Sequence, residues 1–405
     1  MSKTPKLRFK EFSGDWESKK LGDLLEFKNG INASKEQYGH GKKFINVLDI
    51  LSNNYITYEN IIGKVDVDND TFEKNSVGYG DIVFQRSSET RQEVGTANVY
   101  LDKEHKATFG GFIIRGKKIG EYDPIFMNKL LKTSSARKEI TSKSGGSTRY
   151  NVGQETLSDV EVILPSIEEQ EKIAYLFSLI DDKTSLQSEK VNALKEYKKG
   201  MIQKIFSMEL RFKDDDGRDY PKWRKIKLSK VLKERKTYSQ KNEGLEHVTL
   251  SKDGIYRKGD RYDRDFLVVT EDKKYKITKL GDICYYPANL KFGVICRNDY
   301  GNAIFSPIYV TFEVKPEADS EYIGAYLSRW DFINKIRKYE EGTVYERMSV
   351  KPEDFLRFEI NLPSIKEQKK IKEFFNKIDD KIKFEEEKLN RLNDYKKGLI
   401  QQMFI

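Results

Sequence analysis

Two long segments of the chain place apolar residues at alternating steps of four and three positions. Between Ile173 and Ile205, seven of the ten positions on this path are apolar, and between Ile371 and Met403 eight of ten are apolar. A period of 3.5 residues is typical of the seam of a coiled coil. The sequence therefore predicts two long helices that pair with each other. Thirteen of these fifteen apolar positions, all except the terminal Ile205 and Met403, are assigned to the seam: Ile173, Phe177, Ile180, Val191, Leu194, Met201, Ile371, Phe375, Ile378, Ile382, Leu389, Leu392 and Leu399.

Polar residues interrupt both predicted seams at corresponding places. Gln187 matches Glu385, and Lys198 matches Lys396. Such residues either fix the register of a helix pair at a cost in stability, or lie at the solvated ends of an imperfect seam. The alternative for the whole pattern is two amphipathic helices, each packed on its own domain. A 3.6-residue period would drift by about 20° per heptad. Because the observed steps do not drift, the pattern favours paired helices.

A stretch of twenty residues occurs twice in the chain. LPSIEEQEKIAYLFSLIDDK begins at Leu164 and returns as LPSIKEQKKIKEFFNKIDDK at Leu362, 198 residues later. A weaker repeat opens each half, where Leu-Arg-Phe-Lys precedes Trp16 and recurs before Trp223. The residues between these matching ends share little. Duplication of a domain-plus-helix unit, followed by divergence of the domain, explains this pattern.

The repeated stretch also predicts where each long helix begins. Ser166 is a predicted N-cap, and Glu169 lies three residues further on, as in a capping box. The chain is thus divided into two variable domains and two repeated helices. The predicted bounds are 1–158 for the first domain, 159–207 for the first helix, 208–356 for the second domain and 357–405 for the second helix.

The variable domains are predicted to be mixed and rich in strands. Short runs of β-branched and aromatic residues bounded by Gly or Asp are typical of strands. They occur at 44–48, 81–84, 111–114, 282–286 and 308–312, whereas helices are predicted at 124–133 and 322–338. The predicted fold class is therefore α+β, with two divergent α+β domains that are each followed by a long helix.

Composition adds a preference for an anionic partner. The 405 residues include 74 Lys and Arg against 65 Asp and Glu, a net charge of +9. This balance favours nucleic acid as a partner, although an ordinary basic protein can share it. The N-terminal MSKTPKLRFKEF lacks the apolar core of an export signal, and no apolar run of about 18 residues occurs. We therefore expect a cytoplasmic protein. Cys284 and Cys296 are too few for a disulfide framework or a four-ligand zinc site, and are predicted to be reduced packing residues.

A search for catalytic motifs finds none in the sequence, which contains only three histidines. There is no His-Glu-x-x-His metal pattern, no phosphate-binding loop and no Gly-x-Ser-x-Gly turn. Asp102, Glu104 and Lys106 could be combined into a nuclease site, but such matches arise freely among so many charged residues. We expect neither a catalytic residue nor a metal site in this chain.

Two polar loops in each variable domain have the composition of a DNA-reading surface. Arg can contact guanine through two hydrogen bonds, and Asn or Gln can contact adenine, while Gly and Ser let backbone amides approach phosphates. The alternative is that these are ordinary polar surface loops. The candidate DNA-binding residues are Gln85, Arg86, Ser87, Arg91, Ser147, Arg149, Tyr150, Tyr286, Asn289, Lys291, Arg297, Thr343, Tyr345 and Arg347.

The whole chain resembles the specificity (S) subunit of a type I restriction-modification system. The resemblance rests on two divergent domains, each followed by a helix that opens with Leu-Pro-Ser-Ile-x-Glu-Gln and closes with Tyr-Lys-Lys-Gly-x-Ile-Gln. It implies that the variable domains are target recognition domains, each reading half of a bipartite, asymmetric site on double-stranded DNA. It also implies that the helices pair as an antiparallel coiled coil with pseudo-twofold symmetry.

The resemblance further implies a set of partners that carry the chemistry. Two methyltransferase (M) subunits would dock on the helices and transfer methyl from S-adenosylmethionine to adenine N6. Two restriction/translocase (R) subunits, which use ATP, would join to translocate and cut unmodified DNA. The specificity subunit itself would bind no cofactor and have no chemistry of its own, and no membrane is involved.

Two interpretations of other classes stay open. A stand-alone pseudo-dimeric DNA-binding regulator would bind a specific site without a methyltransferase, and a scaffold would bind duplex without sequence preference. A related choice concerns Asp181, Asp182, Lys183 and the stretch 197–200, which are kept in both copies although most lie off the seam. They either face the methyltransferase or stabilise the helix pair through charge contacts.

Overall fold

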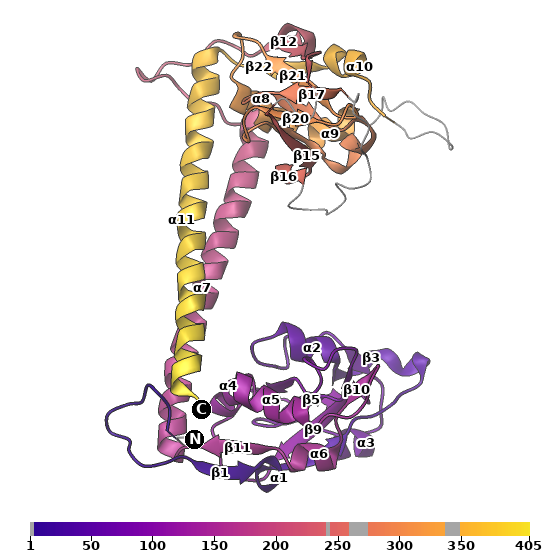
Figure 1. The fold of residues 1–405 in the computed structure, drawn as a ribbon, viewed down its shortest axis with the longest axis vertical. Helices are drawn as coiled ribbons and strands as arrows, with labels where there is room; N and C mark the ends of the chain where they lie inside the picture. Colours follow the sequence, from indigo (N-terminus) through magenta and orange to yellow (C-terminus); the bar gives the residue numbers. More distant parts are fainter. Residues whose placement is uncertain (1–3, 240–243, 259–273, 337–348) are drawn as a thin grey trace. The chain divides into compact units, whose positions relative to one another are not determined.

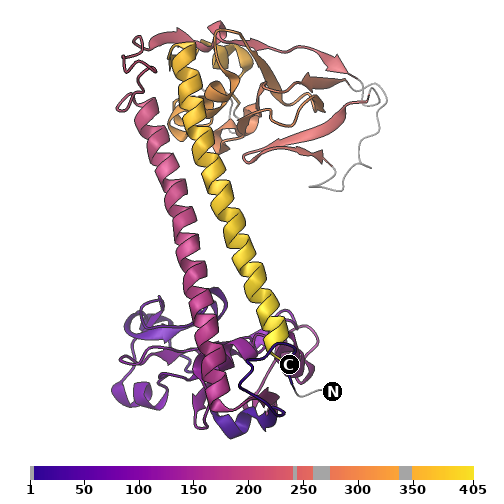
Figure 2. The same cartoon turned by 90° about the vertical axis from the view of Figure 1, so that its left-hand side faces the viewer.

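The computed structural model describes residues 4–239, 244–258, 274–336 and 349–405. It divides into two compact units, one formed by Met1–Lys190 with Glu385–Ile405 and the other by Val191–Phe384. The division falls inside α7 (Ile167–Phe206) and α11 (Ile365–Met403), each of which is one unbroken helix (Figures 1 and 2). The predicted α+β class with two long helices is confirmed. None of the helices in these ranges is both long and apolar enough to cross a membrane.

The first unit combines short strands with small helices (Figure 1). Before α7, its elements are β1 (Glu17–Lys20), α1 (Leu21–Leu24), β2 (Leu25–Asn29), η1 (Lys35–Gln37), β3 (Tyr38–Ile45), α2 (Val47–Ser52), β4 (Lys64–Val65), α3 (Asn69–Lys74), β5 (Ile82–Gln85), β6 (Ser87–Ser88), β7 (Ala97–Val99), β8 (Thr108–Phe109), β9 (Ile113–Lys118), α4 (Pro124–Leu130), α5 (Ser134–Ser142), β10 (Tyr150–Asn151), α6 (Gln154–Ser158) and β11 (Glu161–Leu164).

The second unit has the same general composition. Its elements before α11 are β12 (Arg224–Lys227), η2 (Leu228–Lys230), β13 (Leu232–Glu234), β14 (Tyr238–Ser239), β15 (Glu246–Ser251), β16 (Gly254–Arg257), β17 (Tyr275–Thr278), β18 (Ile283–Tyr285), η5 (Pro287–Phe292), β19 (Ile295–Arg297), β20 (Ala303–Phe305), β21 (Val310–Val314), α8 (Ser320–Leu327), α9 (Trp330–Ile336), α10 (Pro352–Arg357) and β22 (Glu359–Leu362).

Two sequence predictions need correction within these elements. The strand predicted at 44–48 ends at Ile45, because the Asn46 side chain accepts a hydrogen bond from the Leu48 amide and so caps α2. The helix predicted at 322–338 is interrupted, since α8 ends at Leu327 and α9 begins at Trp330. At the interruption, the Ser328 amide and hydroxyl both donate to the Gly324 carbonyl, so Ser328 caps the end of α8.

A four-stranded sheet of the same connectivity lies in each unit. Its strand order is β2-β9-β5-β7 in the first unit and β13-β21-β18-β19 in the second. Ile82 pairs with Gly116 in the first sheet, and Ile283 pairs with Phe312 in the second. Strand β9 therefore corresponds residue for residue to β21. The duplication predicted from the ends of each half extends into the middle of the domains, where the sequence no longer shows it.

The long helices pack against each other within each unit. In the first unit, the Phe177 and Phe404 rings have centroids 5.8 Å apart, and Gln187 Nε2 donates to Glu385 Oε2 at 2.7 Å. Residue numbers thus rise along α7 while they fall along α11, so the pairing is antiparallel. In the second unit, Lys198 Nζ lies 2.5 Å from Asp379 Oδ1, in the same antiparallel sense.

The predicted seam residues lie away from solvent. Nine are buried and four, Leu194, Met201, Leu389 and Leu392, are half-buried; the buried ones are Ile173, Phe177, Ile180, Val191, Ile371, Phe375, Ile378, Ile382 and Leu399. The polar seam residues make contacts between the helices. Besides the Gln187–Glu385 hydrogen bond, Lys396 Nζ lies 2.5 Å from Asp181 Oδ1, and Lys198 makes the equivalent pair with Asp379.

Each long helix packs on a domain as well as on the other long helix. Pairing of the helices and packing on a domain, the two alternatives for the apolar stripe, therefore both occur. In the first unit, the Phe404 ring contacts Phe126 of α4 as well as Phe177, with centroids 5.1 Å apart for Phe126. The second unit repeats this cluster, where Phe206 contacts Tyr322 and Phe375 at 5.4 and 6.3 Å. The repeated phenylalanine near the end of each long helix therefore fills an aromatic core.

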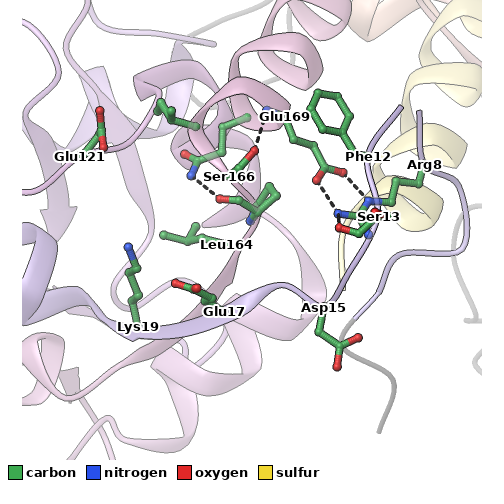
Figure 3. Close-up of a pocket in the computed structure, with 13 residues that line it drawn as sticks. Arg8, Phe12, Ser13, Asp15, Glu17, Lys19, Glu121, Leu164, Ser166 and Glu169 are labelled. Carbon is green, nitrogen blue, oxygen red and sulfur yellow. Dashed lines mark hydrogen bonds and ion pairs between the residues drawn. The ribbon is translucent and has the colours of Figure 1, made fainter. Parts of the chain in front are cut away.

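The two repeated motifs contact each other, and this contact joins each domain to its helix (Figure 3). Arg8 donates from Nε and Nη2 to the two carboxylate oxygens of Glu169 at 2.8 and 2.7 Å. Arg211 makes the same bidentate contact with Glu367 at 3.1 and 2.9 Å. The Glu169 carboxylate therefore binds Arg8 and does not complete a capping box. Ser166 Oγ accepts a long hydrogen bond of 3.5 Å from the Glu169 amide, so Ser166 caps α7 only weakly.

The glutamine of the motif ties the start of the long helix to the preceding domain. Gln170 Nε2 donates to the Pro165 carbonyl at 2.9 Å, and its Oε1 accepts from the Asp123 amide at the start of α4. Gln368 repeats both contacts in the second unit, with Pro363 and Asp319. The Leu-Pro-Ser-Ile-x-Glu-Gln motif is thus kept in both halves because it builds the same joint twice.

Replacing Arg8 with methionine is expected to lower the free energy of unfolding by about 1–3 kcal/mol, since it strands a carboxylate without its charged partner. Glu169 is only 1% exposed beside Arg8, so the guanidinium is the main group that stabilises its charge. Lys20→Met is the matched control, because Lys20 of β1 forms an exposed ion pair with Asp159, which precedes the paired strand β11. Denaturant unfolding measures both variants. Equal losses would contradict a stabilising joint.

Candidate nucleic-acid interface

The structure brings the two predicted recognition loops of the first domain together. Strand β6 pairs antiparallel with β10, so that Ser88 faces Tyr150 and Ser87 faces Asn151. The Val152 amide also donates to the Arg86 carbonyl at 3.0 Å. Two loops that are far apart in the sequence therefore form one surface, which the sequence did not predict.

A tight hairpin presents the second of these loops. The backbones of Gly145 and Asn151 exchange two hydrogen bonds of 3.0 and 2.9 Å, which close the hairpin around residues 146–150. Gly146 has φ +108°, a conformation that favours glycine, and an added Cβ would lie 2.0 Å from the Arg149 carbonyl oxygen. The hairpin exposes Ser147 and Arg149, with Tyr150 half-buried at its base.

Three arginines give this surface its charge. Arg86, Arg91 and Arg149 are exposed, and within the described ranges none of them has a carboxylate within 4.0 Å. Arg91 Nε donates to the Thr141 carbonyl at 3.1 Å, which ties it to the end of α5. Guanidinium groups without acidic partners are available for phosphates or for guanine edges.

Gln85 occupies a different place from the other candidates. It is 5% exposed, and its Nε2 donates to the Ser87 carbonyl at 3.0 Å. The Gln85 side chain is therefore buried under the loop, where it holds the Ser87 backbone, and it is not available to contact a base. Ser87, by contrast, is half-buried at the paired edge of β6.

Changing Gly146 to alanine is expected to weaken DNA binding about tenfold, because the backbone conformation and the Arg149 carbonyl both oppose a side chain there, at a cost of about 1–3 kcal/mol. Gly145→Ala is the control, since no atom lies within 4 Å of the added Cβ at that position. Fluorescence anisotropy with a duplex carrying the site measures both. If the two variants bind alike, the hairpin conformation is irrelevant to recognition.

The second domain presents a different surface around η5. The Tyr286 ring packs on Tyr309 with centroids 5.3 Å apart, and Lys291 Nζ lies 5.5 Å from the Phe292 ring centroid. Asn289 is half-buried within η5. Arg297 is directed to α8, where its Nε donates to Ser320 Oγ at 3.0 Å, and it is ion-paired with Asp299. Thr343, Tyr345 and Arg347 lie outside the described residues.

Three exposed aromatic side chains beside these loops are further candidates that the sequence did not single out. Phe112 is 61% exposed and its carbonyl accepts from the Arg86 amide. Phe292 and Trp330 are 59% and 60% exposed in the second domain, where the Trp330 ring lies over Gly293. An aromatic residue in a sequence usually indicates core, so only the tertiary structure identifies these as surface groups.

The repeated charges of the long helices are divided between core and surface. Asp181 is 7% exposed, pairs with Lys129 and Lys396 and accepts a hydrogen bond from Tyr55, so it stabilises the packing of α7. Asp182 and Lys183 are exposed. Of the two alternatives for this group, charge contact within the protein applies to Asp181.

Neither cysteine is placed for chemistry. Cys284 and Cys296 face each other across β18 and β19 and are free thiols. Burial raises the pKa of the Cys296 thiol to about 12, and raises that of Cys284 well above its ordinary value. Both therefore remain protonated at neutral pH and act as packing residues. Among the described residues, no three His, Cys, Asp or Glu side chains are grouped so as to hold a metal ion.

Comparison with known proteins identifies counterparts of this architecture. The model of the type I restriction modification DNA specificity domain matches residues 13–196 and 222–394. The putative type I restriction enzyme MjaX specificity subunit of Methanocaldococcus jannaschii is 24% identical, over 96% of this chain and 93% of that protein. The MjaIX specificity subunit of the same organism is 28% identical, over 54% and 52%.

Two solved structures share the fold. The S subunit of a type I restriction-modification system from M. genitalium superimposes with a TM-score of 0.54 at 15% identity, covering 99% of both chains. A chain from a study of complex assembly and conformational transition of the type I R-M system gives 0.55 at 14% identity, covering 96% of this chain and 97% of that one. At these identities the likeness concerns the fold.

Proposed function

Because the chain belongs to the type I restriction modification DNA specificity family, we propose that its two domains each read one half of a bipartite, asymmetric DNA site. Proteins named specificity subunits are non-catalytic components of type I restriction systems. The observation that supports the proposal is a contrast between the halves. The Arg8–Glu169 joint recurs in the second unit, whereas the segment between β5 and β7, which carries Arg86 and Arg91, is replaced at the equivalent place between β18 and β19 by the 3-10 helix η5. Different surfaces on equivalent joints favour different half-sites.

The proposal includes partners that supply the chemistry. Tyr197 and Tyr395 occupy the repeated Tyr-Lys-Lys-Gly and are 52% and 58% exposed, so each unit offers the same aromatic group off the seam. Two equivalent surfaces favour two copies of one partner, which we take to be the methyltransferase. The complex would be cytoplasmic, with S-adenosylmethionine on the methyltransferase subunits and ATP on two restriction/translocase subunits, and with no cofactor on this chain.

The proposal is tested by co-expressing this chain with the methyltransferase subunit encoded beside it, in a host that lacks other DNA methylation. Genome-wide mapping of methyladenine is expected to give one asymmetric, two-part motif with a fixed gap. A soluble complex that binds DNA without methylation would favour the stand-alone regulator instead. Failure to form any complex would count against the docking of a methyltransferase.

Tyr197 and Tyr395 allow the docking to be tested separately. Changing both to serine is expected to reduce co-purification of the methyltransferase, while DNA binding by the purified chain stays unchanged. Lys204→Ser is a suitable control, because this exposed residue also lies on α7 but is not kept in the second copy, where Gln402 stands. Unchanged co-purification of the tyrosine variant would remove this surface from the proposal.

A further inference from the structure

A basic cavity of about 820 Å³ lies in the first unit, away from the recognition hairpin. Its lining comes from β2, from the end of α3 and the segment that follows it, from Lys106, and from β9 with the residues just after it. Six cationic side chains line it, against the three carboxylates of Glu26, Glu73 and Asp81; the cations are Lys28, Lys74, Lys106, Arg115, Lys117 and Lys118. The lining therefore carries an excess of positive charge.

Six cations against three carboxylates leave a formal excess of three positive charges in the lining. Glu73 pairs with Lys106 at 3.0 Å. The two oxygens of Asp81 accept from the backbone amides of Gly78 and Lys118, each at 2.9 Å. Glu26 is exposed, and within the described ranges it has no ion pair of 4.0 Å or less. Lys74 and Lys117 are likewise exposed, with no ion pair there.

Arg115 is the buried cation of the cavity. It is 6% exposed, and no carboxylate among the described residues lies within 4.0 Å of its guanidinium. One Nη donates to the Ser76 carbonyl, the guanidinium carbon lies 5.7 Å from the Phe109 ring centroid, and Nε has no hydrogen-bond partner. Burial lowers the pKa of this group, and the more distant charges of Asp81 and Glu26 offset the lowering only in part. A buried charge without a direct ion pair is costly to the fold.

The second unit shows that the sheet itself does not require an unpaired cation. Arg115 of β9 corresponds to Thr311 of β21, because each is the residue before the partner of Ile82 or Ile283. Asp81 corresponds to Asp282, because each directly precedes that isoleucine. There, Arg235 donates to both oxygens of Asp282 at 2.7 and 2.8 Å, and this hydrogen bonding raises the pKa of Arg235. The cation beside this aspartate is paired inside the second domain, whereas Arg115 has no such partner in the first.

We propose that the basic cavity of the first unit binds a phosphate group. A guanidinium at the floor and exposed ammonium groups at the rim match the hydrogen-bond acceptors and the negative charge of phosphate. The phosphate could be a small free anion or could belong to a DNA backbone, and the two sources share this chemistry. Arg86 contacts one end of β9, at Phe112, whereas Lys117 lies five residues further along, about 17 Å at 3.4 Å per residue. None of the residues that line the cavity belongs to the β6–β10 pair or to its hairpin, so the two sites are distinct.

Thermal unfolding of the full chain in inorganic phosphate, against chloride at equal ionic strength, tests the proposal. Phosphate is expected to raise Tm by several degrees, because a ligand that binds only the folded state stabilises it. The double variant Lys74→Ala, Lys117→Ala changes only exposed side chains and is expected to lose most of this rise. Lys233→Ala, on an exposed position of β13 in the second domain, is the matched control and should keep it. An equal rise in the double variant, or no rise beyond chloride, would overturn the proposal.

Competition distinguishes the source of the phosphate group. Binding of inorganic phosphate is followed by isothermal titration calorimetry, with and without a saturating duplex. Displacement by the duplex, together with weaker duplex binding by the double variant, assigns the site to a DNA backbone phosphate. Phosphate binding that persists beside the duplex assigns it to a small anion. Neither result depends on recognition of a DNA sequence. The proposed reading of a bipartite site is tested separately by methylation mapping, so failure of one proposal can be distinguished from failure of the other.

Discussion

Replacing Asp181 with asparagine is expected to lower the free energy of unfolding by about 3–5 kcal/mol, because it removes one partner of a buried ion pair. Asp181 Oδ2 lies 2.6 Å from Lys129 Nζ, and Oδ1 lies 2.5 Å from Lys396 Nζ. Lys129 is 5% exposed, so neither water nor salt can replace the missing carboxylate. Denaturant unfolding of the full chain measures the effect.

The repeat supplies the matched control for this experiment. Asp379 is the equivalent residue in the second helix, where it pairs with Lys198 but is 50% exposed. Asp379→Asn is expected to cost about 0–1 kcal/mol, as exposed pairs do. Similar losses in the two variants would contradict the conclusion that burial determines how much this repeated aspartate contributes to the free energy of unfolding.

Acid titration gives a second measure of the same cluster. Burial acts to raise the pKa of Asp181, but a hydrogen bond and the charge of Lys129, with hydrogen bonds from Lys396 and Tyr55, outweigh it and lower the pKa below its ordinary 3.8. A lowered carboxyl pKa contributes stability that is present above the unfolded-state value and is lost as pH falls through the folded value. The wild type should therefore lose more stability than Asp181→Asn below about pH 4. Parallel acid profiles would contradict this.

Changing Arg86 and Arg149 together to alanine is expected to weaken binding to the specific duplex by about 1–3 kcal/mol per arginine, or about tenfold to a hundredfold for each. Both guanidinium groups stand beside the β6–β10 pair without acidic partners in the described structure. Fluorescence anisotropy gives the affinity. Arg218→Ala is the control, because Arg218 is also exposed but lies in the segment that leads to β12.

The pattern of methylation separates two ways in which these arginines could act. An arginine that reads a base should relax the motif at one position of one half-site. An arginine that contacts phosphate should weaken all sites alike and reduce the salt dependence of binding. Loss of specificity in both half-sites at once would contradict the assignment of this surface to a single half.

Predictions from the sequence succeeded where the signal is local or repeated. The 4-3 spacing of apolar residues indicates α7 and α11, because a helix brings such positions to one face regardless of the rest of the fold. The loop composition around Arg86 and Arg149 is visible in the sequence, but the sequence does not show that β6 and β10 pair. Gln85 illustrates the limit, since its amide suits a base edge and yet is buried beneath the loop.

The sequence by itself determined the two long helices, the duplication and the motifs that each half keeps. Only the tertiary structure decided that Arg8 and Glu169, 161 residues apart, are partners, and that the repeated Asp181 and Asp379 have unequal burial. It also showed the unpaired charge of Arg115 beside the paired charge of Arg235. The reason is physical: periodicity acts through neighbours along one helix, whereas burial and charge pairing depend on which distant segments pack together.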